Sequence, residues 1–153
     1  MRQAIGLGYS LERRLPASCL LITPSVDLAN SVYGTLEREL ASRVWVWQEP
    51  SLESALRVLG VCRFRVILLD MAMAEALAGS VLRALKEGAP ETPLILLAVG
   101  SATPLGIERA RLGAARLRLS GATAVAPRGD AGALVRAVRE ILAMPVANPP
   151  DTA

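Results

Sequence analysis

Residues 65–73, Arg-Val-Ile-Leu-Leu-Asp-Met-Ala-Met, are the stretch of this sequence that decides its fold. The apolar run from Val66 to Leu69 is too short for a helix, and two of its four residues are β-branched. It therefore predicts a strand that is buried on both faces, as at the centre of a parallel sheet. Asp70 follows at the carboxyl end of this strand, which is where open α/β sheets place ligands and chemistry. The function of the chain therefore depends on whether Asp70 is chemically active.

The composition indicates one globular domain. The chain has 153 residues, of which 52% are hydrophobic and 20% are charged, so it is long enough to bury a core and too apolar for a disordered chain. No apolar run approaches the ~20 residues that a membrane-spanning helix needs. Glu12, Arg13 and Arg14 interrupt the N-terminal segment before a secretory signal develops. We therefore expect no membrane association and a cytoplasmic location.

Histidine is absent, and this absence excludes several kinds of catalytic and metal site. Ser-His-Asp and Cys-His catalysis, histidine metal ligands and phosphohistidine relays all need an imidazole. The two cysteines, Cys19 and Cys62, cannot form a structural zinc site unaided, and they predict free thiols in a reducing compartment. We expect both to be small buried residues near the starts of strands. We also expect no metal and no cofactor.

Hydrophobic periodicity predicts five strands that alternate with five helices. The strands are expected at residues 18–22, 44–48, 65–69, 94–99 and 122–126, and the helices at residues 26–40, 52–60, 75–87, 103–120 and 131–143. Ser25, Ser51 and Asp130 are the predicted N-caps of the first, second and fifth helices. This succession predicts an α/β fold with a five-stranded parallel sheet, helices on both faces and the flavodoxin-like strand order 2-1-3-4-5.

The two ends of the chain lack this periodicity, and the charge is uneven between them. Residues 1–16 are interpreted as an N-terminal extension, residues 17–143 as a single domain, and residues 144–153 as a Pro-rich tail or linker. Residues 26–100 carry 7 basic and 9 acidic side chains, whereas residues 101–140 carry 7 basic and 3 acidic ones. The basic C-terminal third fits either an acidic partner or a solvated surface.

Trp45 and Trp47 alternate onto one face of the second predicted strand, which the strand order places at an edge of the sheet. We predict that both are core residues beneath a helix. An exposed pair would instead mark a contact surface.

Five stretches of the chain together carry a family resemblance. They are Leu20-Leu21-Ile22, Val66-Ile67-Leu68-Leu69-Asp70-Met71-Ala72-Met73, Pro93-Leu94-Ile95-Leu96-Leu97, Gly121-Ala122, and Asp130 leading into Leu134-Val135-Arg136-Ala137-Val138. In this order the sequence resembles the receiver domains of bacterial two-component response regulators over about residues 18–142. The resemblance implies that Asp70 matches the aspartate that accepts a phosphoryl group from a histidine kinase.

The chain departs from this family at the positions that surround the phosphoacceptor. The acidic pair that holds Mg²⁺ after the first strand is matched by Thr23 and Pro24. The switch hydroxyl after the fourth strand falls on Ala98, and the aromatic residue that rotates with it falls on Val125. The lysine after the fifth strand is matched by Arg128, which keeps the charge with a different geometry. Because a lone carboxylate is a poor site for a divalent cation, the pattern is typical of a degenerate, or pseudo-, receiver.

Alternatives remain at two places. Asp70 could be a working phosphoacceptor with an atypical cation site, or a structural residue that caps the following turn or pairs with Arg128. The fifth strand could also lie at residues 115–119. Residues 122–126 are preferred because the spacing through Arg128 and Asp130 to the last helix then needs no insertion.

Arginines dominate the predicted partner surface. The candidate interface residues are Arg109, Arg111, Arg116, Arg118, Arg136 and Arg139. The first four would lie in pairs on opposite sides of one helix, so they form no single stripe for nucleic acid, and few aromatic residues are available to stack on bases. In the family, the surface of the fourth helix, fifth strand and fifth helix serves dimerisation and output. We therefore predict a regulatory, non-enzymatic module that binds protein or a second copy through this surface, rather than nucleic acid, cobalamin or flavin.

Overall fold

The central strand of the fold is β3 (Val66–Asp70), and all five of its residues are buried. The computed structural model describes residues 17–76, 80–98, 124–127 and 130–144. The other described strands are β1 (Ala17–Ile22), β2 (Val44–Glu49), β4 (Leu94–Ala98) and β5 (Ala124–Pro127). The helices are α2 (Val26–Leu40), the short 3₁₀ helix η1 (Ala41–Arg43), α3 (Leu52–Leu59), α4 (Met71–Ala76), α5 (Ser80–Gly88) and α7 (Ala131–Ala143).

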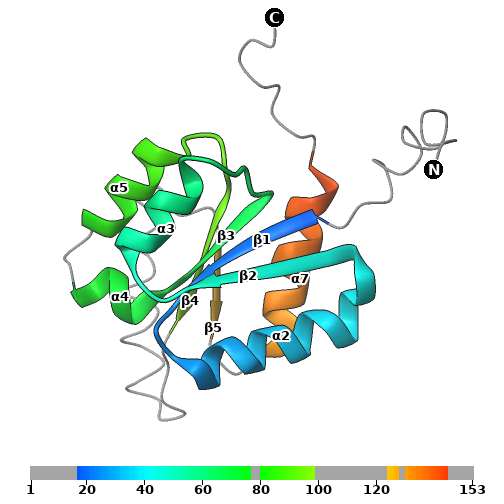
Figure 1. Cartoon of the computed structure of the whole chain (residues 1–153). Coiled ribbons are helices and arrows are strands. Elements are labelled where there is room, and N and C mark those ends of the chain that lie inside the picture. The colour runs from blue at the N-terminus through cyan, green and yellow to red at the C-terminus, as the bar shows by residue number, and fades with distance from the viewer. Residues whose placement is uncertain (1–16, 77–79, 99–123, 128–129, 145–153) are drawn as a thin grey trace, which may run out of the picture.

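The strands form one parallel sheet in the order β2-β1-β3-β4-β5 (Figure 1). The predicted α/β fold is therefore confirmed, as is the flavodoxin-like succession 2-1-3-4 of its first four strands. The strand that pairs with β4 comprises residues 124–127, which agrees with the preferred placement of the fifth strand. The alternative placement, residues 115–119, lies outside the described residues.

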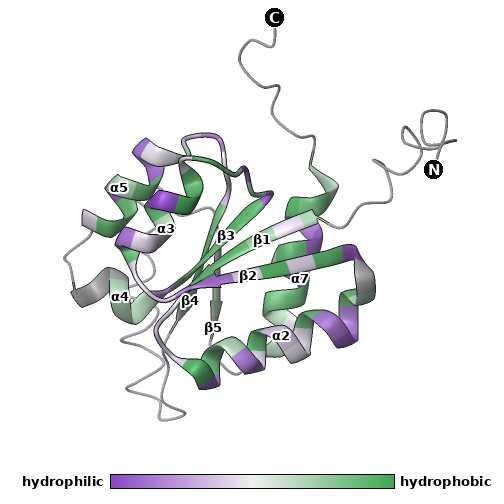
Figure 2. Cartoon of the chain, in the orientation of Figure 1, coloured by the Kyte–Doolittle hydropathy of each residue, from purple (hydrophilic) through white to green (hydrophobic). Residues whose placement is uncertain are grey.

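Two apolar cores lie on opposite faces of the sheet, because successive side chains of a strand point to opposite sides. In β1, Cys19 and Leu21 contact the core beneath α2 and α7, whereas Leu20 and Ile22 contact the core beneath α3 and α5. Figure 1 shows α2 and α7 on one side of the strands and α3 and α5 on the other. In Figure 2 the strands are largely hydrophobic, whereas the helices alternate hydrophobic and hydrophilic residues. The predicted coverage of both faces is confirmed.

The three predicted N-caps are confirmed. The side chains of Ser25, Ser51 and Asp130 accept hydrogen bonds from the backbone N–H groups of residues 28, 54 and 133, at 3.0, 3.1 and 2.9 Å. Each bond satisfies a donor that has no partner inside the first helical turn.

The third helix begins earlier than predicted. In place of one helix over residues 75–87, the structure has α4 directly after β3 and then α5, with residues 77–79 outside the description. The start was misplaced because Asp70 itself organises the turn, by accepting a hydrogen bond from the N–H of Ala72 at 3.0 Å. The predicted helix over residues 103–120, the extension and most of the tail also lie outside the described residues.

The predictions for the two tryptophans and for Cys62 are wrong. Trp45 is 53% exposed and Trp47 is 39% exposed. Trp47 pairs in register with Leu20, so it points to the face that α3 and α5 cover, but β2 lies at the edge of the sheet and these helices do not bury its ring. Cys62 is exposed in the loop between α3 and β3, whereas Cys19 is buried as predicted.

Candidate functional site

The candidate site lies at the carboxyl ends of β1 and β3, which are neighbours in the sheet. Their register pairs Ile22 with Leu69, so the next residue of each strand, Thr23 and Asp70, comes side by side. Both side chains are almost inaccessible, with exposed fractions of 0% for Thr23 and 4% for Asp70. The structure thus brings Asp70 and Thr23 together at the carboxyl end of the sheet, where open α/β folds bind ligands.

The Thr23 hydroxyl joins the Asp70 carboxylate to the backbone. Thr23 Oγ1 donates to Asp70 Oδ2 at 2.8 Å and accepts a hydrogen bond from the N–H of Ser25 at 3.0 Å. The other carboxylate oxygen, Asp70 Oδ1, accepts from the N–H of Ala72 at 3.0 Å. Each oxygen of Asp70 thus has a donor from the protein itself, which is the usual requirement for a buried polar group.

The main chain of Thr23 is also held from the other side, by β2. Its N–H donates to the carbonyl oxygen of Glu49 at 3.0 Å, and its carbonyl oxygen accepts from Gln48 Nε2 at 3.0 Å. Thr23 therefore connects the carboxyl ends of three adjacent strands. Sequence analysis missed Gln48, although its position at the end of a strand next to β1 is the signal that could have identified it.

Thr23 and Pro24 give the site no carboxylate besides that of Asp70 with which to hold a divalent cation. Mg²⁺ prefers several oxygen ligands in near-octahedral geometry, usually including carboxylates. Pro24 is exposed and has no side-chain ligand, and the Thr23 hydroxyl is directed at Asp70 as a donor. In the described part of the chain, no three acidic, cysteine or histidine side chains gather into a group that could hold a metal ion.

The remaining predicted switch positions are only partly described. Ala98 is the last residue of β4 and pairs in register with Pro127, and Val125 pairs with Leu96. The backbone thus places both positions on the neighbouring strands β4 and β5. Arg128 lies outside the described residues, so its predicted pairing with Asp70 stays a prediction.

Two of the six candidate interface arginines, Arg136 and Arg139, lie on α7. Both are exposed. Arg139 Nη2 donates to the carbonyl oxygen of Glu39 at 3.3 Å, so this side chain also connects α7 to α2. The other four, Arg109, Arg111, Arg116 and Arg118, lie outside the described residues.

Comparison with known proteins gives structural matches alone. No family model matches the sequence, and no curated protein sequence matches it. A signal receiver domain of a histidine kinase from Syntrophus aciditrophicus is similar in structure, with a TM-score of 0.66, 21% identity, and coverage of 90% of this chain and 98% of that one. The chemotaxis response regulator CheY4 of Vibrio cholerae has a TM-score of 0.62 at 21% identity, with 82% and 98% coverage. The chain has the fold of a receiver domain.

A third similar structure also comes from a histidine kinase. It is the receiver domain of a sensor histidine kinase from Pseudomonas aeruginosa, with a TM-score of 0.63, 16% identity, and coverage of 84% of this chain and 99% of that one. It is described as having a magnesium ion coordinated in its active-site cleft. The receiver fold is thus shared with a protein that holds Mg²⁺, whereas Thr23 and Asp70 of this chain are bonded to each other.

Among the described residues, no helix combines the length and the apolar character needed to cross a bilayer.

Proposed function

We propose that this chain is a receiver-like regulatory module that acts by binding protein and does not depend on phosphorylation of Asp70. The observation that carries the proposal is the buried hydrogen bond from Thr23 Oγ1 to Asp70 Oδ2, 2.8 Å long. It lies where a phosphoacceptor site would need cation ligands. On this proposal the chain is a pseudo-receiver and not an enzyme.

The chemistry of phosphoryl transfer supports this proposal. The transferred group carries negative charge that metal ions and cationic side chains neutralise, and the phosphorylated aspartate would also need room and hydrogen-bond donors. Asp70 is buried, forms no ion pair with a described residue, and has both oxygens occupied by donors of the chain. Phosphorylation would therefore have to break the bond to Thr23 without gaining an evident stabilising cation from the described residues.

A fixed site implies a fixed conformation. Because Thr23 is bonded to β2, β3 and the start of α2, we expect the module to be regulated by the availability of its partner rather than by a change at Asp70. The interface predicted from the sequence, which includes Arg136 and Arg139, stays a prediction. We place the module in the cytoplasm, where free thiols such as those of Cys19 and Cys62 persist.

The proposal is tested with a small phosphodonor. Protein is incubated with acetyl phosphate and Mg²⁺, and the products are followed by intact mass and by amide NMR, with Asp70→Asn as the matched control. We expect neither protein to gain a phosphoryl group over its own untreated mass, and we expect no saturable amide shifts around Asp70. A phosphoryl mass increase that disappears in Asp70→Asn would overturn the proposal in favour of a phosphoacceptor with an atypical cation site.

A further inference from the structure

The outer edge of β2 presents main-chain groups to the surroundings. Among the described strands, β2 is an end strand of the sheet and pairs with β1. The bond from the N–H of Thr23 to the carbonyl oxygen of Glu49 shows that the backbone groups of Glu49 point toward β1. Because this direction alternates along a strand, the N–H and C=O groups of Val44, Val46 and Gln48 point outward.

This edge lacks the features that usually prevent edge-to-edge pairing. Protective features include Lys, Pro, short strand length and bulges. β2 pairs with β1 in unbroken register over six residues, and the segment Val44-Trp45-Val46-Trp47-Gln48 has neither charge nor proline. The edge is therefore a regular template for another strand.

The side chains of β2 are also unusual for a solvated edge. Trp45 and Trp47 are exposed on one face, with their ring centroids 5.7 Å apart in a T-shaped arrangement. Large exposed aromatic groups are enriched at protein interfaces. A strand added beside β2 would place its own side chains next to these two rings.

We propose that β2 pairs antiparallel with β2 of a second copy of this chain, about a two-fold axis at Val46. In this register Trp45 lies opposite Trp47 of the partner subunit, and Val44 lies opposite Gln48 of the partner subunit. Arg43, the last residue of η1, and Glu49, the last residue of β2, then form two symmetry-related pairs of opposite charge across the dimer. The tryptophan pairs fall at positions without main-chain hydrogen bonds, where facing side chains come closest.

Charge complementarity selects this register and this partner. The even-numbered residues must pair with even-numbered ones, because only their backbone groups point outward. Moving the register by two residues in either direction places Arg43 opposite Trp47, or Glu49 opposite Trp45, of the partner subunit. Of these three registers, only the one centred on Val46 places Arg43 and Glu49 opposite each other. A second copy of the chain supplies both charges, because a two-fold interface is self-complementary. A continuous sheet across two subunits results.

This inference specifies the interaction surface of the module proposed above, and it depends on that proposal only for the idea that the chain acts by binding protein. The described hydrogen bonds of the Asp70 side chain go to Thr23 and Ala72, neither of which takes part in the proposed β2 pairing. A positive phosphodonor test would overturn the proposed function but not the β2 dimer. A protein that stays monomeric would overturn the β2 dimer but not the proposed function.

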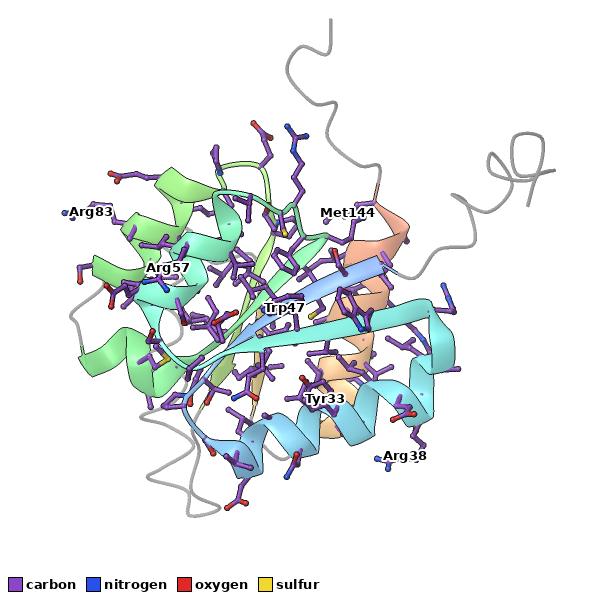
Figure 3. The ribbon with its side chains drawn as sticks, viewed as in Figure 1. Tyr33, Arg38, Trp47, Arg57, Arg83 and Met144 are labelled. Atoms are coloured by element: carbon purple, nitrogen blue, oxygen red, sulfur yellow. The ribbon has the colours of Figure 1, made fainter. Side chains whose placement is uncertain are left out.

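Charge reversal tests the register in solution. Sedimentation velocity is measured on the whole chain from micromolar to near-millimolar concentration for the wild type, Arg43→Glu, Glu49→Arg and the double variant. Each single variant creates two like-charge pairs, so we expect the dimer dissociation constant to rise roughly tenfold, and the double variant to restore it. Arg83→Glu is the control, because Arg83 lies on α5, away from β2 (Figure 3), and should leave dimerisation unchanged.

Amide hydrogen exchange tests the pairing itself. Exchange at Val44, Val46 and Gln48 should slow as protein concentration rises, whereas the N–H groups of Trp45 and Trp47 point toward β1 and should show no such dependence. A monomer at every concentration would overturn the inference. So would a dimer that ignores the Arg43 and Glu49 variants but dissociates in Arg136→Glu/Arg139→Glu, because that dimer would use the α7 surface.

Discussion

Thr23 shows how one hydroxyl can bind a neighbouring carboxylate. An aspartate at this position would repel Asp70 and attract a cation, whereas the neutral hydroxyl donates a hydrogen bond to Asp70 Oδ2 and accepts one from the N–H of Ser25. The bond is buried, so it is shielded from competing water. Hydrogen bonds to a charged acceptor contribute about 1.5–3 kcal/mol, which is large for a single contact in a domain of this size.

Replacing the hydroxyl by a methyl group should therefore be costly. Thr23→Val keeps the shape of the side chain but leaves Asp70 Oδ2 and the N–H of Ser25 without this partner, and we expect the free energy of unfolding to fall by about 1–3 kcal/mol. Urea unfolding measures the loss. A double-mutant cycle with Asp70→Ala is the control, because Thr23→Val should cost clearly less once the carboxylate is gone. Equal costs in both backgrounds would contradict the importance of this bond.

Cys19 gives a second prediction, on pH. Burial raises the pKa of its thiol above the ordinary value of 9.0, because the thiolate would lose its hydration. Above about pH 9 the unfolded chain releases this proton while the folded chain keeps it, so the stability present at neutral pH is lost by up to about 1.4 kcal/mol per pH unit. Unfolding measured from about pH 8 to pH 10 should show this slope. The Cys19→Ala variant should lose the contribution of this thiol to the slope of stability against pH. An unchanged slope in this variant would contradict the burial argument.

At the scale of elements, α2 contains a glycine that its packing does not require. Gly34 lies inside this 15-residue helix, and a Cβ built there would have no heavy atom within 4 Å. Glycine in a helix interior costs about 0.5–1 kcal/mol relative to alanine, so Gly34→Ala should raise the free energy of unfolding by about that amount. Gly88→Ala is the matched control. A Cβ at this position would lie 3.3 Å from Leu56 Cδ2, so this variant should gain less free energy of unfolding. Thermal unfolding distinguishes the two, and equal gains would contradict this reading.

The elements themselves were largely predictable because their signals are local. Short apolar runs bounded by polar residues identified the strands, and Ser25, Ser51 and Asp130 identified helix starts through a single side-chain contact each. What failed depends on neighbours that are distant in sequence. Alternation along β2 correctly put Trp45 and Trp47 on one face, but only the lateral position of α3 determines whether that face is covered at the sheet edge.

The position of Thr23 and Asp70 in the sheet could be predicted from the sequence, but the hydrogen bonds that they form could not. The strand order brings Thr23 and Asp70 together, and this order follows from the α/β pattern. Sequence reasoning treated Thr23 as a missing carboxylate, since a family pattern compares side chains by charge. Its role as a donor depends on rotamer and distance, and the contribution of Gln48 depends on the reach of its side chain across β1. Such contacts are set by the packed structure, not by a motif.

For the molecule as a whole, the site lies at the carboxyl end of the sheet that separates the two cores. Thr23 follows β1, whose side chains contribute to both faces of the sheet, and it bonds to β2 and β3 at once. A change there should be felt in global stability rather than in a local loop. Ligand binding to the site can therefore be read from the thermal unfolding of the entire chain, because a ligand that binds only the folded state stabilises it by mass action.

This linkage provides a test of whether a cation site can be built beside Asp70. Thr23→Asp/Pro24→Asp places two carboxylates next to Asp70, so without metal their repulsion should lower Tm, and Mg²⁺ should relieve it. At about a hundred times Kd the metal would contribute roughly 2.7 kcal/mol, or a rise of several degrees for a chain of this length, reversed by EDTA. The wild type should show no such rise, and adding Asp70→Asn to the double variant should reduce it. An EDTA-reversible rise in the Tm of the wild type would instead mean that Asp70 and its neutral neighbours can bind Mg²⁺. The metal would then replace the hydrogen bond from Thr23.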